Sequence, residues 1–269
     1  MVHPPHTKNK KISFDTNHQK RRDAIDRVSS FLMRKSYIRE RLMKNKPIPT
    51  LFLILLLLVV YADALHSQDT IPLKNPSFEG VPQRGMHGKP FIKMWNDCGL
   101  SQFPSDSPPD IHPVIDNAWG VSMLAQDGET YLGLVVRANA SWESVSQRLF
   151  IPLRAGVCYS LTAMLALSDI YESATAMSQK LGTFELENFA NPVMLVIWGG
   201  RTDCDKLEIL AESSDVANHE WKPYTLILSP HSNYTHITIE AYYSKTKEEL
   251  YNGHIMVDNL SPIVEVECK

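Results

Sequence analysis

The chain has 269 residues, of which 43% are hydrophobic and 21% are charged, and its formal net charge is −3. This length and composition are ordinary for a globular protein and allow a sizeable buried core. The small net charge gives no reason to expect a nucleic acid or another polyanion as the partner of the whole chain.

An apolar run at residues 51–62, LFLILLLLVVYA, follows a strongly basic N-terminal region. Lysines precede the run, and the small-residue pattern Ala62-Asp63-Ala64 follows it. These features predict a secretory signal peptide over residues 43–64. The alternative is a retained transmembrane anchor over residues 49–64, although a membrane span usually takes about 20 apolar residues.

Residues 1–42 make an unusually long basic extension in front of a signal peptide. Met43 is followed directly by Lys-Asn-Lys, which is a short basic region of the ordinary kind. Our hypothesis is that translation starts at Met43 and that residues 1–42 are not translated. If they are translated, they form a basic cytosolic arm and favour the anchor.

All four cysteines follow this segment, at Cys98, Cys158, Cys204 and Cys268. An even number in an exported chain permits disulfides, and the sequence does not choose among the three full pairings. Cys158 lies in an apolar strand pattern that also suits a buried free thiol. The spacing of the cysteines predicts no structural zinc site. We expect the chain to be exported to an extracellular, periplasmic or cell-surface location.

The region from residue 69 to residue 269 contains short apolar segments that alternate with period two and are rich in β-branched and aromatic residues. Both properties indicate β-strands. In chain order the expected strands are 130–136, 143–149, 159–167, 193–198, 221–228, 236–243, 255–257 and 263–266. No sustained helical pattern occurs. We therefore predict one all-β domain, a two-sheet antiparallel β-sandwich of the jelly-roll type.

Short motifs at both ends of this region resemble a known family. Residues 73–80 read LKNPSFEG and residues 255–262 read IMVDNLSP. Between them, residues 147–156 read QRLFIPLRAG and residues 197–200 read IWGG. In their order and spacing these blocks resemble the galactose-binding-like jelly rolls. They are most similar to the carbohydrate-binding modules for xylan and glucan in bacterial secreted and surface proteins. The resemblance covers residues 71–262 and implies that the first and last strands are neighbours.

The resemblance also implies one structural calcium ion where the first and last strands meet. Glu79 and Asp258 occupy the matching positions. Calcium prefers carboxylate and carbonyl oxygens, and a cation between two carboxylates would offset their repulsion. The alternative is that each carboxylate caps a turn or pairs with a lysine.

A carbohydrate site needs exposed aromatic faces and a few hydrogen-bonding side chains. Three aromatic residues lie in polar, loop-like surroundings and are expected to be exposed: Trp119, Trp142 and Tyr171. We expect them to contact a polysaccharide or glycan, with Trp119 and Tyr171 as the preferred pair. The other tryptophans suit the core.

The sequence contains neither a Gly-x-Ser-x-Gly elbow nor a His-Glu-x-x-His motif. A glycosidase needs two carboxylates about 5 to 9 Å apart, and no spacing here singles out such a pair. We therefore predict non-catalytic glycan binding by a secreted or envelope-associated protein that is not an enzyme. We expect no nucleic-acid partner, and membrane contact only through an uncleaved N-terminal segment. The alternatives are a structural or adhesive surface protein with a protein partner, and a glycoside-active enzyme.

Overall fold

The computed structural model describes residues 70–85, 92–102, 104–113, 119–175 and 186–268. They belong to the second of two units into which the chain divides, residues 68–269. The predicted signal peptide, the alternative anchor and the basic extension lie outside the described residues. Among the residues that are described, no helix is long and apolar enough to cross a membrane.

The described residues form fifteen short strands and one single-turn helix. The strands are β1 (Thr70–Ile71), β2 (Asn96–Asp97), β3 (Asp106–Ser107), β4 (Asp110–His112), β5 (Tyr131–Arg137), β6 (Ser141–Leu153), β7 (Cys158–Ala166), β8 (Glu172–Ala174), β9 (Leu186–Asn188), β10 (Met194–Gly200), β11 (Glu208–Glu212), β12 (Lys222–Leu228), β13 (Tyr234–Tyr242), β14 (Gly253–Asp258) and β15 (Ile263–Val266), and the helix is α3 (Gly99–Gln102). All eight expected segments are strands, namely β5, β6, β7, β10, β12, β13, β14 and β15.

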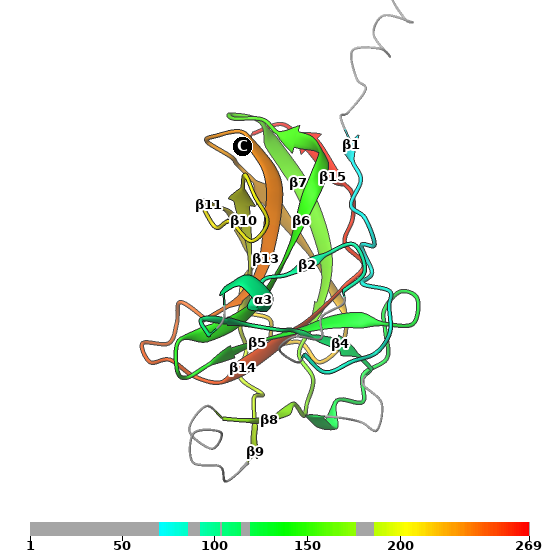
Figure 1. Cartoon of the computed structure of the whole chain (residues 1–269), viewed down its shortest axis with the longest axis vertical. Helices are drawn as coiled ribbons and strands as arrows, with labels where there is room; N and C mark the ends of the chain where they lie inside the picture. The colour runs from blue at the N-terminus through cyan, green and yellow to red at the C-terminus, as the bar shows by residue number, and fades with distance from the viewer. Residues whose placement is uncertain (1–69, 86–91, 103, 114–118, 176–185, 269) are drawn as a thin grey trace, which may run out of the picture. The chain divides into compact units, whose positions relative to one another are not determined.

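Thirteen of the strands form one continuous sheet, which curls on itself (Figure 1). Its order is β1-β15-β7-β14-β5-β6-β13-β10-β11, and β12 pairs with the free side of β7. The long strand β6 pairs with β5 near its start and with β13 farther along, so it passes from one layer to the other. The predicted β-sandwich is therefore present as two layers that share β6, and not as two separate sheets. Strands β8 and β9 form a small sheet of their own.

The main core lies inside the curl, and alternate residues of each strand supply it. In β5, Leu132, Leu134 and Val136 point into the main core, whereas Tyr131 and Val135 point to the opposite face. That opposite face carries a second cluster of buried residues, called the outer cluster here: Val121, Tyr131, Val135, Ala166, Tyr171, Phe189 and Met256. Because both of its faces are covered, β5 has a nearly unbroken apolar sequence.

The two ends of the domain lie side by side, as the resemblance implies. Strand β1 pairs with β15 in antiparallel register, with Thr70 opposite Val264. Two disulfides resolve the pairing that the sequence left open: Cys98 with Cys204, and Cys158 with Cys268. The alternative of a free thiol at Cys158 is therefore wrong.

Candidate functional site

The loops that carry Trp119 and Tyr171 meet on the outer face of β5 and β14. The two aromatic rings are stacked, with centroids 6.4 Å apart, so the structure brings the preferred pair together. Trp119 is half-buried, and the guanidinium of Arg84 lies 5.1 Å from its ring centroid. The expectation that Tyr171 is exposed needs correction, because only 1% of it is accessible. Its ring stacks on His254 at 4.7 Å and belongs to the outer cluster.

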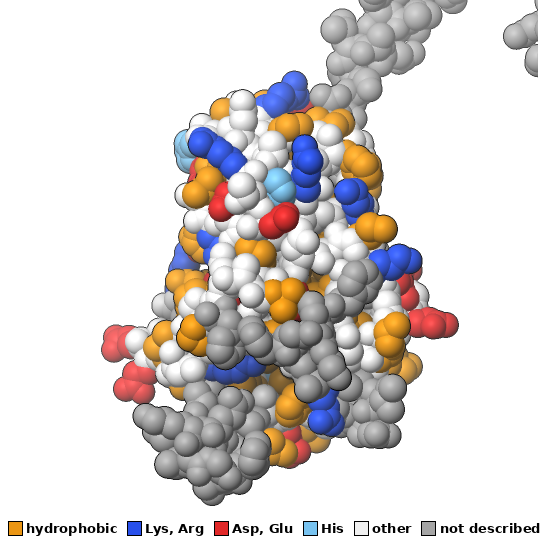
Figure 2. All heavy atoms as spheres, in the orientation of Figure 1, with side chains coloured by type: hydrophobic (Ala, Val, Ile, Leu, Met, Phe, Trp, Pro, Cys, Tyr) orange, Lys and Arg blue, Asp and Glu red, His pale blue; other side chains and the backbone are white. Residues whose placement is uncertain are grey.

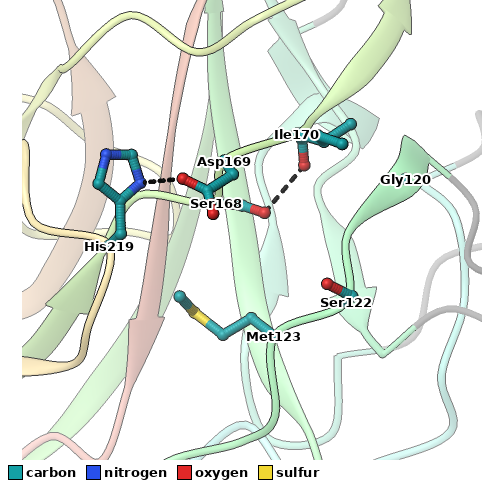
Figure 3. A pocket seen from close by; sticks show the side chains of 7 residues that line it. All are labelled: Gly120, Ser122, Met123, Ser168, Asp169, Ile170 and His219. Carbon is teal, nitrogen blue, oxygen red and sulfur yellow. Dashed lines mark hydrogen bonds and ion pairs between the residues drawn. The ribbon is translucent and has the colours of Figure 1, made fainter.

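A pocket of about 300 Å³ opens between these two loops (Figure 3). It is lined by Gly120, Ser122, Met123, Ser168, Asp169, Ile170 and His219. The Asp169 carboxylate lies 2.8 Å from Nδ1 of His219, and the Ser168 hydroxyl donates to the carbonyl of Ile170 at 2.9 Å. Polar groups thus converge beside the apolar side chains of Met123 and Ile170. This combination is typical of a small-molecule site.

Buried His254 fixes the position of the pocket wall formed by residues 168–171 through a hydrogen bond to its backbone. The backbone N–H of Ser168 donates to Nε2 of His254 at 2.9 Å, so the other ring nitrogen carries the proton and donates to the Phe189 carbonyl at 2.7 Å. Burial lowers the pKa of His254 to about 4, which keeps the ring neutral near pH 7. Asn188 adds a second tether, since its side chain bonds to the backbone of Asp169 and Tyr171.

Beneath the pocket wall lies a buried charge cluster, defined here as Asp110, Arg137, Glu143 and Tyr171. The Arg137 guanidinium lies 2.6 Å from the Glu143 carboxylate, and the Tyr171 hydroxyl donates to the Asp110 carboxylate. Burial raises the pKa of Glu143 to about 8, although Arg137 acts in the opposite direction. The sequence analysis did not single out this cluster. One signal was available, because Glu143 is a charged residue within an alternating apolar strand.

Trp142 is a residue of β6 and does not line the pocket. It contacts a second group of buried charged side chains. Nζ of Lys206 is 5.2 Å from the Trp142 ring centroid and 3.0 Å from the carboxylates of both Asp106 and Glu240. Burial raises the pKa of Glu240 to about 7, and Lys206 opposes that shift. The structure therefore does not bring Trp142 together with Trp119 and Tyr171.

The predicted calcium ligands, Glu79 and Asp258, both contact the loop 126–130. Glu79 accepts two of its backbone N–H groups, at 2.9 and 3.3 Å, and Asp258 accepts two others, at 2.8 and 3.0 Å. Burial raises the pKa of Asp258 to about 6. Among the described residues, no group of three or more His, Cys, Asp or Glu could hold a metal ion. The donors share Oε1 of Glu79 and Oδ2 of Asp258, so these contacts favour the alternative that each carboxylate caps a loop.

Calcium at Glu79 and Asp258 is an untested expectation of the sequence, whereas loop capping by the two carboxylates predicts no effect of calcium, and calorimetry distinguishes the two. We expect the melting temperature of the purified domain to be the same in millimolar calcium and in excess chelator. Differential scanning calorimetry at a fixed pH measures the difference. A melting temperature that rises with calcium and falls again with chelator would show that a cation does bind.

No family model matches the chain, and no curated protein matches it. Several solved structures are similar. A Stig cyclase from Fischerella sp. TAU is 14% identical, with a TM-score of 0.43 over 76% of this chain and 100% of the cyclase chain. An arabinose-bound GH51 α-L-arabinofuranosidase is 11% identical, with a TM-score of 0.44 over 73% of this chain and 26% of the other. The CBM22-1 xylan-binding domain of Paenibacillus barcinonensis Xyn10C is 13% identical, with a TM-score of 0.38 over 75% of this chain and 97% of the xylan-binding domain.

These similarities correct the prediction that the chain is not an enzyme. A cyclase and an arabinofuranosidase, which are enzymes, are among the similar structures, and the expectation of a non-enzyme is therefore withdrawn. A xylan-binding domain is among them as well. At these identities and TM-scores, none of the similarities assigns a ligand or a reaction to this chain.

Proposed function

We propose that the domain binds a glycan in the pocket between residues 119–123 and 168–171. The observation that carries this proposal is the convergence of the Asp169 carboxylate, the His219 imidazole and the Ser168 hydroxyl beside apolar side chains. A sugar ring has hydroxyl groups around its edge and C–H groups on its faces, so it needs both kinds of contact.

The donors and acceptors of the pocket suit hydroxyl groups. One oxygen of Asp169 faces His219, which leaves the other oxygen as an acceptor for a sugar hydroxyl. The Ser168 hydroxyl uses its hydrogen on the Ile170 carbonyl, so its oxygen can accept as well. Trp119 immediately precedes Gly120 of the lining and packs against Tyr171 and Arg84, and we propose that its half-buried ring borders the site. Tyr171 supports this wall from inside and has no role in direct contact.

The two disulfides support the export of the domain, because such bonds persist mainly in oxidising compartments. On the face shown in Figure 2, the basic side chains of the described residues are interspersed with acidic, hydrophobic and neutral ones. This mixed surface favours a neutral ligand over a polyanion such as nucleic acid. We therefore propose an extracellular or envelope glycan.

The proposal is tested with Asp169→Asn, which changes a lining residue, and with Trp119→Ala, which changes the residue next to the lining. We expect Asp169→Asn to weaken glycan binding roughly tenfold or more, because a hydrogen bond to a charged group contributes about 1.5–3 kcal/mol. We expect Trp119→Ala to weaken binding as well, through loss of the aromatic face. A glycan array identifies the ligand, and isothermal titration calorimetry then measures the dissociation constants.

Glu248→Gln is the matched control for Asp169→Asn, because it removes an exposed carboxylate that does not line the pocket. We expect this control to bind as tightly as the unmodified domain. The proposal fails if the unmodified domain binds no glycan, or if Asp169→Asn and Glu248→Gln bind equally well.

A further inference from the structure

Resting on the glycan-binding function proposed above, we infer that the pocket takes the end of a sugar chain, a single terminal ring, and not an internal segment. The size of the pocket is the first argument. Its volume of about 300 Å³ lies at the lower end of the range for ligand sites, which is roughly 300–1,000 Å³.

The second argument is that one side of the pocket is closed. Gly120 and Ile170 come from the two opposite loops, and a Cβ added to Gly120 would lie only 2.5 Å from Cγ2 of Ile170. Figure 3 shows the Ile170 side chain directed toward Gly120. Gly120 also has a φ of 70°, which disfavours any side chain there. The two loops therefore touch, and an extended chain cannot leave the pocket between them.

The closed side is also firmly held. Ser168 and Tyr171 lie on either side of Ile170, and their backbone N–H groups donate to buried His254 and to the side chain of exposed Asn188, respectively. His254 is completely buried and bonds with both ring nitrogens. Moving the backbone of Ile170 away from Gly120 would therefore strain these hydrogen bonds.

The opposite side of the pocket is open and polar. The side chains of Asp169 and His219 are 83% and 53% exposed and face each other there. A terminal ring that enters on this side keeps the rest of its chain in solvent beyond the Asp169–His219 pair. In the described part of the chain, the pocket thus has a closed side at Gly120 and Ile170 and an exposed side at Asp169 and His219.

Chain ends can be varied without changing the sugar. The probe is the polysaccharide that the array identifies. Its binding to the domain is measured at equal mass before and after partial acid hydrolysis, which creates new chain ends. Its constituent monosaccharide serves as the competitor. We expect binding per unit mass to rise in proportion to the number of chain ends, and the monosaccharide to displace the polymer. Binding that is unchanged by hydrolysis and insensitive to the monosaccharide would overturn the inference and leave the proposed function intact. No binding to any glycan would overturn both.

A variant of the closed wall gives an independent readout. Ile170→Ala shortens the side chain that meets Gly120 and opens the wall, so we expect binding to intact polymer to rise severalfold relative to hydrolysed polymer. Leu250→Ala is the control, because Leu250 is similarly exposed (49% against 46%) and does not line the pocket. An unchanged ratio in Ile170→Ala, equal to that of the control, would contradict the closed-wall argument.

Discussion

Replacing Cys98 and Cys204 together with alanine is expected to lower the free energy of unfolding by about 4 to 5 kcal/mol. The bond joins residues that are 106 positions apart, so its loss frees a long loop in the unfolded chain. A loop of about 100 residues corresponds to ~4.7 kcal/mol on the chain-entropy model. This loss is a large part of the total stability of an ordinary domain, which is roughly 5–15 kcal/mol.

The measurement is equilibrium unfolding in urea, with the midpoint and the slope recorded for each variant. The pair Cys158→Ala and Cys268→Ala is the matched comparison, because that bond closes a loop of similar length, 110 positions. We expect similar losses from the two pairs. A loss below about 1 kcal/mol for both would mean that the unfolded chain is already restrained without the bonds.

Arg137→Met is expected to destabilise the domain by about 3–5 kcal/mol at high pH, because it removes one partner of a buried ion pair. The side chains of Arg137 and Glu143 are only 16% and 3% exposed, and they lie 2.6 Å apart. Without the guanidinium, an ionised Glu143 has no cation within the cluster. The cost therefore appears only when Glu143 is charged.

The pH dependence of this cost has a definite sign. Burial raises the pKa of Glu143 from 4.5 to about 8, so the folded domain binds this proton more tightly than the unfolded chain. As the pH rises from about 4.5 toward about 8, the unfolded chain ionises Glu143 while the folded domain keeps it protonated, so this group lowers stability progressively over that range. Removing Arg137 raises the pKa further. The penalty of Arg137→Met should thus be small near pH 5 and largest above pH 8.

Thermal or urea unfolding of both proteins at pH 5, 7 and 9 gives this penalty, and other titrating groups cancel in the difference. The control is the double variant Arg137→Met with Glu143→Gln, which leaves no charge in that pair. We expect the double variant to recover much of the loss at pH 9. An identical penalty at pH 5 and pH 9 would mean that Glu143 is not the cause.

The local sequence pattern predicted strands such as β7 but did not predict the very short strands β2, β3 and β4. Strands such as β7 alternate over nine residues, so their own sequence carries the signal. Strands β2, β3 and β4 have only two or three residues and lie in loop-like sequence. Their extended form comes from pairing with β6 or β5, which is a tertiary contact that no local pattern records.

The structure brings together the two loops that carry Trp119 and Tyr171, but the sequence analysis gave Tyr171 the wrong environment. Polar neighbours such as Asp169 and Glu172 suggested that Tyr171 faces solvent. Tyr171 is buried because its loop lies across the outer face of β5 and β14. Its ring stacks there on His254 and Phe189. Residues distant in sequence, such as His219, join the pocket only through the fold.

The pairing of β1 with β15 bears on how the chain reaches its native state. Thr70 and Ile71 find their partners only at residues 264 and 263, and each disulfide also joins residues more than a hundred positions apart. Such remote contacts make a topology slow to form, because loop-closure entropy is lost before the contacts are gained. A chain emerging from a ribosome or a translocation channel therefore keeps β1 unpaired until residues 263 and 264 have followed.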